Sequence, residues 1–302
     1  MEEALTGLTA AQKTLSPKWL YDDRGSALFE EITEVPEYYP TRTEAAIFET
    51  MMPHLPALFP AGGDIIEYGS GASKKTVALI ETLRPAIYRP LDIAADFLAQ
   101  AAAGLQAQFP NIAVKPVVAD FTDPSQIPAT EEGAPPRLGF FPGSTIGNLT
   151  DDQRHTFLAG ARKGLGDGAR FLLGADLVKD KTVLEAAYDD AVCGSAALNL
   201  NLLTRMNREL GTNFDVSAFE HKALFNGDAS RIEMHLVSLG SQTVSLGGKS
   251  IPFADGETIH TENSYKFTVD MIDELAAVTG WRLAQTWTDP KDWFGVFWLE
   301  AV

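Results

Sequence analysis

Three acidic side chains stand at equivalent places in the first half of the chain. Glu67, Asp92 and Asp120 each follow a short apolar run typical of a buried strand. Because ligands of open α/β sheets bind at the carboxyl ends of the strands, we expect these carboxylates to lie along one sheet edge. There they can accept hydrogen bonds from ribose hydroxyls and from the amino group of a base. Each acid alone would more often cap a helix, but three in register favour a nucleoside ligand.

A glycine turn follows the first of these acids. Residues 64–76 (DIIEYGSGASKKT) lead from an apolar strand through Gly69 and Gly71 into a run compatible with a helix. Glycines allow positive φ and lack Cβ, so the backbone N–H groups of such a turn can approach a ligand closely. A lone Gly-x-Gly is more often only a bend, and the third glycine of the dinucleotide fingerprint is absent because Lys74 takes its place. The turn beside an acid therefore favours S-adenosylmethionine (SAM) over NAD or FAD.

Aromatic side chains form a second group that could bind a ligand. Tyr21, Phe29 and Tyr38 lie within one short N-terminal span that is rich in rings and acids. A single ring there would usually pack on the core, but several phenols in one segment favour a polar, aromatic pocket wall. Asn148 ends a loop of small residues after the fourth expected strand. Its amide either contacts a substrate or serves as a turn residue, and the loop pattern leaves both open.

The elements that must position these residues alternate between strands and helices. This alternation predicts a parallel α/β sheet. After residue 180 the pattern changes to helices and then to antiparallel strands with glycine-rich turns, and the α/β pattern resumes after residue 266. We therefore predict an α/β, Rossmann-like core of residues 46–179 and 267–302. An inserted α+β substrate-binding domain would comprise residues 180–266, joined by residues 1–45.

Charge and composition narrow the class of partner. The chain has 302 residues, 45% of them hydrophobic, which is enough for a substantial core. A formal charge of -17 leaves no basic stripe for phosphates, so we expect no nucleic acid and no membrane as partner. No apolar run reaches the roughly 20 residues of a membrane span, and the first residues do not look like a signal peptide. We expect a cytoplasmic protein with a small-molecule substrate.

Cysteine and histidine give little support for a metal site. Cys193 is the one cysteine in the chain, which excludes an internal disulfide and multi-cysteine zinc patterns, and we expect a buried thiol. The five histidines have no ligand spacing along the sequence. We therefore expect no metal.

Five motifs, taken together, resemble the histidine-specific, SAM-dependent Nα-methyltransferases of ergothioneine biosynthesis. The resemblance covers nearly the whole chain, and the motifs are residues 19–33 (WLYDDRGSALFEEIT), 36–42 (PEYYPTR), 67–73 (EYGSGAS), 141–148 (FPGSTIGN) and 261–264 (TENS). It implies a class I methyltransferase core with a separate substrate domain. It also implies three methyl transfers to the α-amino group of L-histidine, which give hercynine.

The resemblance also assigns residues to the site. It implies that one group surrounds the α-amino and carboxylate groups of the substrate, and these residues are Tyr21, Phe29, Tyr38, Gly143, Asn148 and Tyr188. Among them Tyr21, Tyr38 and Asn148 would hold the reacting amine. Glu262 and Ser264 would contact the imidazole, and Met234 would form a pocket wall. The SAM site would comprise Glu67, Gly69, Ser70, Gly71, Asp92, Asp120, Phe121 and one of Lys74 and Lys75; motif matching leaves the choice of lysine open.

Three other functions stay open. An aromatic pocket could hold another amino acid, such as tryptophan or tyrosine, although a buried Glu262 without a polar partner would be costly. A SAM-binding module without catalysis would be expected if the substrate residues were degenerate. A nucleotide-dependent oxidoreductase is the third alternative. The oligomeric state is not determined by the sequence, and we expect a monomer.

Overall fold

The structure is a computed structural model, and it describes residues 1–70, 74–127, 133–192 and 194–302. Gly71 and Cys193 therefore lie outside the described residues, and so does the side chain of Lys74. The chain divides into two compact units. Unit 1 contains residues 1–41 and 179–266, and unit 2 contains residues 42–178 and 267–302.

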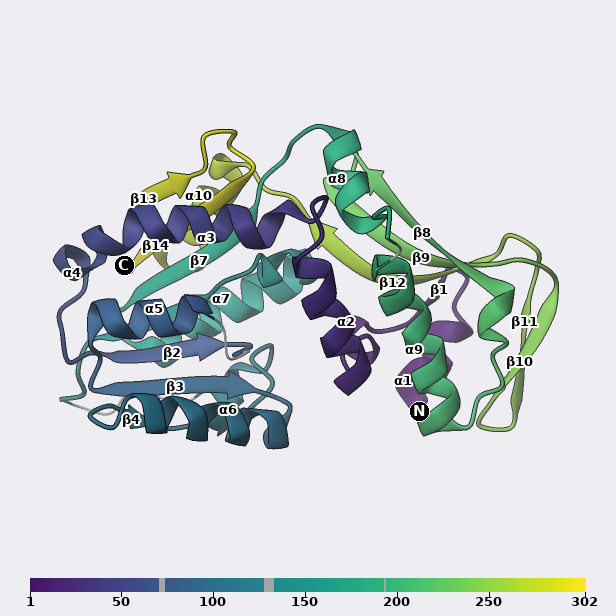
Figure 1. Cartoon of the computed structure of the whole chain (residues 1–302), viewed down its shortest axis with the longest axis horizontal. Coiled ribbons are helices and arrows are strands. Elements are labelled where there is room, and N and C mark those ends of the chain that lie inside the picture. Colours follow the sequence, from purple (N-terminus) through teal and green to yellow (C-terminus); the bar gives the residue numbers. More distant parts are fainter. Residues whose placement is uncertain (71–73, 128–132, 193) are drawn as a thin grey trace. The chain divides into compact units, whose positions relative to one another are not determined.

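Within the described residues, unit 2 is built on one eight-stranded sheet (Figure 1). Its strand order is β13-β14-β7-β6-β2-β3-β4, and β5 also pairs with β3. Neighbouring strands from β4 to β7 run parallel, whereas β14 runs antiparallel to both β7 and β13. The strands are β2 (Asp64–Tyr68), β3 (Ile87–Asp92), β4 (Ala113–Val114), β5 (Val117–Val118), β6 (Arg137–Phe141), β7 (Arg170–Asp176), β13 (Trp281–Thr288) and β14 (Phe294–Ala301).

Helices cover both faces of this sheet, which explains the nearly continuous apolar runs of its central strands. On one face, Ile80 of α5 packs in a core with Ile65 and Phe140 of the sheet. On the other face, the Phe157 ring of α7 lies 4.6 Å from the Phe141 ring of β6. The helices are α3 (Tyr39–Met51), α4 (Leu55–Leu58), α5 (Lys74–Leu83), α6 (Ala95–Gln108), α7 (Asp151–Leu165) and α10 (Val269–Val278).

Prolines explain where two elements begin or end. Residues 112–118 form two short strands, β4 and β5, because Pro116 lies between them and has no N–H for the ladder. Pro40 is the second residue of α3, where a helix needs no N–H donor. A capping box begins α7, with Thr150 and Gln153 bonded reciprocally.

Unit 1 combines a four-stranded sheet, in the order β1-β12-β9-β8, with a separate hairpin of β10 and β11. Its core joins α9 to α2 and β9 through buried side chains such as Leu202, Leu28 and Leu236. The strands are β1 (Lys13–Thr14), β8 (Phe219–Asn226), β9 (Arg231–Ser238), β10 (Gln242–Leu246), β11 (Lys249–Phe253) and β12 (Thr258–Tyr265). The helices are α1 (Glu2–Leu8), α2 (Asp23–Thr33), α8 (Lys181–Tyr188) and α9 (Gly194–Leu210).

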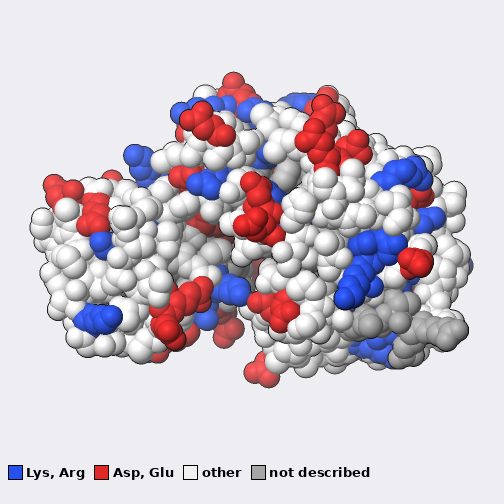
Figure 2. Space-filling view, turned by 180° about the vertical axis from the view of Figure 1, so that it is seen from behind, with Lys and Arg blue, Asp and Glu red and all other residues white. Residues whose placement is uncertain are grey.

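The fold-class prediction of a Rossmann-like α/β core with an inserted α+β part is confirmed by this topology. Acidic and basic side chains are scattered in small groups over the mainly uncharged face shown in Figure 2. Among the described residues, no helix combines the length and the apolar character needed to cross a bilayer.

Candidate active site

The glycine turn after β2 is supported by a buried acid. Glu67 is 1% exposed, and its two carboxylate oxygens accept hydrogen bonds from Thr76 Oγ1 at 3.0 and 2.8 Å. The hydroxyl of Tyr88 donates to Glu67 Oε2 at 2.7 Å and lies 3.0 Å from Ser70 Oγ. Burial raises the pKa of Glu67 to about 7, against the opposing effect of these hydrogen bonds. Glu67 is thus hydrogen-bonded to Thr76 and Tyr88, and Tyr88 connects Ser70 to the same network.

At Gly69, the first residue after β2, a ligand can approach the backbone closely. Gly69 has φ +69°, a conformation that L side chains rarely adopt, and a Cβ there would lie 3.4 Å from Cε1 of Phe121. Phe121 is half-buried, and its ring packs edge-on against Phe141 at 5.2 Å. A ligand close to Gly69 would therefore also lie close to the ring of Phe121.

The two further strand-end acids lie where the sequence predicts. Asp92 ends β3, and its Oδ1 accepts a hydrogen bond from the backbone N–H of Ala94 at 2.8 Å. Burial raises the pKa of Asp92. Asp120 follows β5, and its Oδ1 accepts from the backbone N–H of Thr122 at 2.9 Å. These turns hold each carboxylate at the carboxyl end of its strand.

Two exposed apolar side chains beside these acids are missing from the sequence predictions. Ile93 is 56% exposed and directly follows Asp92, and Val118 is 60% exposed and pairs with Asp92 across the strands. Large apolar side chains this exposed, at a strand end lined with acids, suit the face of a flat base. The sequence signal that could have found them is their position next to a strand-end acid.

A buried ion pair braces the loop after β6. Glu44 of α3 is 1% exposed, accepts a hydrogen bond from the backbone N–H of Gly143 at 2.8 Å and pairs with the Lys75 ammonium. Lys75 is thus the ion-pair partner of Glu44, while the side chain of Lys74 lies outside the described residues. Gly143 has φ +78°, and the loop continues into a short 3-10 helix (Thr145–Asn148) that ends at Asn148. Sequence reasoning misses Glu44.

The aromatic residues expected around a substrate come together in unit 1. The ring of Phe29 lies 5.8 Å from Tyr21 and 6.0 Å from Tyr38, and the ring of Tyr38 lies 6.1 Å from Tyr188, all edge to face. The start of α2 positions the first of them, because Asp22 caps the helix by accepting from the Gly25 N–H at 2.8 Å. Four rings from three segments thus form one aromatic row.

The expected imidazole readers, Glu262 and Ser264, share a face of the unit 1 sheet. Glu262 and Ser264 of β12 lie opposite Met234 and Ile232 of β9. A register shift between His260 and Glu262 places Glu262 on the face of Met234, opposite to the face of His260. Both readers are buried, at 7% and 4% exposed.

Glu262 lies among groups that alter its ionisation. Its Oε1 is 3.4 Å from the Tyr21 hydroxyl. Burial raises the pKa of Glu262 to about 7, and the charge of Lys266 and the Tyr21 contact oppose that rise. The side chain of Tyr21 is 40% exposed, but its hydroxyl group is buried. This burial is the main reason why the pKa of Tyr21 is raised well above 10, and the negative charge of Glu262 is the second reason. Tyr21 is therefore a neutral phenol at physiological pH.

One charged residue that sequence reasoning misses belongs to this cluster. Lys266 is 0% exposed, and its ammonium donates to Ser264 Oγ at 2.8 Å and to the Tyr188 hydroxyl at 3.0 Å. The Tyr188 hydroxyl and Ser264 Oγ are themselves 2.7 Å apart. The structure thus joins Tyr188, Ser264 and Lys266 into one hydrogen-bonded group.

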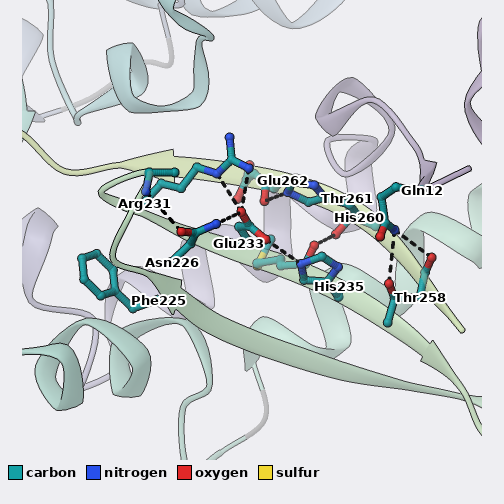
Figure 3. Close-up of polar contacts among 12 residues, drawn as sticks. Gln12, Phe225, Asn226, Arg231, Glu233, His235, Thr258, His260, Thr261 and Glu262 are labelled. Carbon is teal, nitrogen blue, oxygen red and sulfur yellow. Dashed lines mark hydrogen bonds and ion pairs between the residues drawn. The ribbon is translucent and has the colours of Figure 1, made fainter. Parts of the chain in front are cut away.

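On the opposite face of the sheet, strand pairing brings together Glu233, His235 and His260, whose ligand-type atoms lie within 4.8 Å of one another (Figure 3). An ion held by two imidazoles must lie in both ring planes, but these rings stack with centroids 4.6 Å apart and planes 22° apart. Arg231 also holds Glu233 Oε1, at 2.6 Å from Nη2. The geometry is that of a hydrogen-bonded stack and not of a coordination set.

Comparison with known proteins identifies the family of the whole chain. A family described as "Histidine-specific methyltransferase, SAM-dependent" matches residues 1–301. The chain is 44% identical over 298 residues to the histidine N-alpha-methyltransferase of Mycolicibacterium smegmatis, covering 96% of this chain and 91% of that protein. It is 38% identical over 301 residues to the histidine N-alpha-methyltransferase of Mycobacterium tuberculosis, covering 97% of this chain and 92% of that protein.

A solved structure, that of the PH0226 protein from Pyrococcus horikoshii OT3, matches with a TM-score of 0.51 at 10% identity. The match covers 93% of this chain and 100% of that one, and it supports the fold alone. The family match over residues 1–301, in contrast, confirms the resemblance drawn from the five sequence motifs, with SAM as the cofactor. The chain belongs to the family of histidine-specific, SAM-dependent methyltransferases.

Proposed function

We propose that this protein transfers methyl groups from SAM to the α-amino nitrogen of L-histidine. Three successive transfers would give Nα,Nα,Nα-trimethyl-L-histidine (hercynine), a step of ergothioneine biosynthesis. The observation that carries this proposal is the buried pair of Glu262 and Ser264 on one face of β12. A carboxylate and a hydroxyl two residues apart on a strand can contact both nitrogens of one imidazole.

The strand ends of unit 2 would bind the cofactor. Asp92 would accept hydrogen bonds from the ribose hydroxyls, and Asp120 from the adenine amino group. The base would lie against Phe121 and the exposed side chain of Ile93. The positive φ of Gly69 supports close approach of the ligand to the backbone of the turn. When bound, SAM supplies a methyl group that is already activated for transfer.

The protein would then have to align the amine rather than activate it covalently. The α-amino group must be neutral to attack, and we propose that the phenol oxygens of Tyr21 and Tyr38 accept its two N–H groups and orient the lone pair. Because the pKa of Tyr21 is raised well above 10, this phenol would position the amine and would not act as its base. The amine proton would leave to water.

The same rings suit a product that has lost all of its N–H groups. A trimethylated amine is a fixed cation without donors, and aromatic faces attract such cations. The edge-to-face row of Tyr21, Phe29, Tyr38 and Tyr188 offers several faces of this kind. We propose that this row tolerates each successive methylation.

Histidine is favoured over tryptophan and tyrosine because neither of these ring systems can satisfy Glu262 and Ser264 together. A buried carboxylate that loses its polar partner is costly, so both competitors should bind worse. Free L-histidine as the substrate, a monomeric state and a cytoplasmic location stay predictions.

The test is a competition assay with methyl-labelled SAM and equimolar histidine, tryptophan and tyrosine. We expect label on histidine alone. Glu262→Ala should raise KM for histidine more than it lowers kcat, because it removes a contact made equally in the ground state and the transition state. Label on tryptophan or tyrosine, or unchanged kinetics of the variant, would contradict the proposal. Calorimetric titration with NAD and with SAM distinguishes the methyltransferase, which should bind SAM, from the oxidoreductase alternative, which should bind NAD.

A further inference from the structure

Asn199 of α9 is a fully buried amide that none of the five sequence motifs contains. Neighbouring residues of that helix, such as Leu202, pack in an apolar core, where an amide without hydrogen bonds would be costly. Nδ2 of Asn199 lies 3.1 Å from the backbone oxygen of His235 and 2.9 Å from Nδ1 of His221. Its Oδ1 lies 2.7 Å from Oγ1 of Thr261. The amide thus connects β8, β9 and β12 of unit 1.

These contacts determine the direction of each hydrogen bond. The carbonyl of His235 can only accept, so the NH2 group of Asn199 must face it, and the second N–H of that group points to Nδ1 of His221. Nε2 of His221 lies 2.8 Å from the backbone oxygen of Tyr188, so this nitrogen must carry a proton. His221 is therefore the neutral Nε2–H tautomer, and burial, which lowers the pKa of His221, favours the same form.

The donor of His221 holds the end of the helix that carries Tyr188. Tyr188 is the last residue of α8, and the last carbonyl groups of a helix have no partner within it. The Nε2–H group of His221, on β8, supplies a donor to the carbonyl of Tyr188. This bond helps to keep the Tyr188 hydroxyl in place, 2.7 Å from Ser264 Oγ.

Thr261 stands where β12 changes its register against β9. The shift lies between His260 and Glu262, and Thr261 is the residue between them (Figure 3). Its side chain is 1% exposed, and its hydroxyl donates to Asn199 Oδ1 in the shorter of its two contacts with acceptors. Because the shift turns Glu262 to the face of Met234, the bond that holds Thr261 also holds the direction of Glu262.

We infer that Asn199, His221 and Thr261 form a positioning network that sets the affinity of the protein for the imidazole of its substrate. Through Thr261 the network fixes the direction of Glu262, and through His221 it fixes the end of α8. The three residues act through the groups that contact the substrate. The inference rests on the proposed function, since it takes L-histidine as the ligand.

The test compares Thr261→Val with Thr261→Ser, which keeps the hydroxyl group. Histidine is titrated calorimetrically into each protein after saturation with S-adenosylhomocysteine. We expect Thr261→Val to raise the Kd for histidine about tenfold, because a binding group displaced by as little as about 1 Å loses its best contacts. Thr261→Ser should restore most of the affinity. In the methylation assay, the KM of Thr261→Val for histidine should rise more than its kcat falls.

Thr212 offers a matched control in the same unit. It is also buried, and its Oγ1 also donates to an asparagine of α9, the Oδ1 of Asn207, at 2.7 Å. Asn207 in turn bonds to the backbone of Phe214. Thr212→Val should lower the melting temperature about as much as Thr261→Val and leave the Kd and the KM for histidine unchanged. A threonine that merely supports folding would give that same result at position 261.

A second measurement needs no ligand. Nitrogen-15 NMR of protein labelled in its histidine rings reports the tautomer of His221, whose signals are assigned by their absence from His221→Gln. We expect the neutral Nε2–H form at neutral pH. A proton on Nδ1 of His221 would overturn the network, and this result does not depend on whether Thr261→Val folds.

The outcomes separate this inference from the proposed function. A folded Thr261→Val protein with wild-type Kd for histidine overturns the inference, while the proposed function stands. An equal loss of affinity in Thr212→Val and Thr261→Val also overturns it. A wild-type protein that binds no histidine overturns the proposed function, and the inference with it.

Discussion

Glu262 is a carboxyl group kept away from water. Burial raises its pKa to about 7, and the charge of Lys266 opposes the rise only in part. In the unfolded chain the same carboxyl has a pKa of about 4.3. Between these values the folded state binds more protons than the unfolded state, so the contribution of Glu262 to stability falls as pH rises, and this loss is complete above about pH 7.

We predict that Glu262→Gln stabilises the folded protein by up to about 4 kcal/mol at pH 8 and by less than about 1 kcal/mol near pH 4.5. The variant removes an ionisation that folding opposes, and it should raise KM for histidine at the same time. Urea unfolding at the two pH values measures the difference. Equal stability of variant and wild type at pH 8 would contradict the account.

Glu233 on the neighbouring strand is the control for this prediction. It is also buried, but hydrogen bonds from Asn226 and Arg231 outweigh the effect of burial and lower its pKa to about 2. Its ionised form is therefore stabilised by folding above about pH 4.3, and this stability is lost as pH falls toward 2. Glu233→Gln should accordingly destabilise the protein at pH 8, opposite in sign to Glu262→Gln.

Residues that carry a motif can be predicted, whereas residues defined by tertiary contacts cannot. Spacing along β12 predicts that Glu262 and Ser264 share a face. Glu44 and Gly143 are 99 positions apart in the sequence, and no local pattern relates them. Lys266 looks like an ordinary lysine next to a strand end until the structure shows that it is 0% exposed.

Gly69, directly after β2, combines a backbone conformation that L side chains rarely adopt with the expected cofactor site. Gly69 has φ +69°, and alanine in that conformation costs about 1 kcal/mol. We predict that Gly69→Ala lowers stability by this amount and weakens SAM binding by about tenfold, because the turn must distort where the ligand approaches its backbone. Calorimetric titration with SAM and thermal unfolding measure the two effects.

Gly168 offers a control that isolates the cost of placing a side chain at positive φ from any effect on ligand binding. It has φ +71°, and a Cβ there would meet no atom within 4 Å. Gly168→Ala should cost about the same 1 kcal/mol and leave the affinity for SAM unchanged. If both variants lost stability equally and neither lost affinity, the turn would not bind the cofactor.

The loop after β6 depends on the buried ion pair of Glu44. Glu44→Ala would leave the Gly143 N–H without this acceptor and the Lys75 ammonium without its partner, for a stability loss of about 3 kcal/mol. Glu257→Ala breaks the more exposed pair with Lys13 and should cost about 1 kcal/mol or less. Denaturant unfolding compares them, and equal losses would contradict the role of Glu44.

At the level of elements, the sequence pattern predicts the alternation and the inserted segment because period and turn residues are local signals. It does not predict the break at Pro116 or the helix start at Pro40, because proline can end one element or begin the next. It also cannot predict the stack of His235 on His260, which depends on the register of two strands.

Across the whole molecule, we expect each unit to bind one ligand, SAM in unit 2 and histidine in unit 1. S-adenosylhomocysteine alone should slow amide hydrogen exchange mainly in unit 2, in β2, β3 and the turns that follow them. Histidine added to that complex should slow exchange in unit 1, in residues 19–39 and in β12. Protection of unit 1 by the cofactor alone, with none in unit 2, would contradict the assignment.

The most direct measurement is mass spectrometry of a reaction that contains the purified protein, SAM and the twenty amino acids in equal amounts. We predict that histidine alone gains methyl groups, up to three, and that fragmentation places all of them on the α-nitrogen. Methyl groups on the imidazole ring or on another amino acid, or unmodified histidine after SAM is consumed, would contradict it.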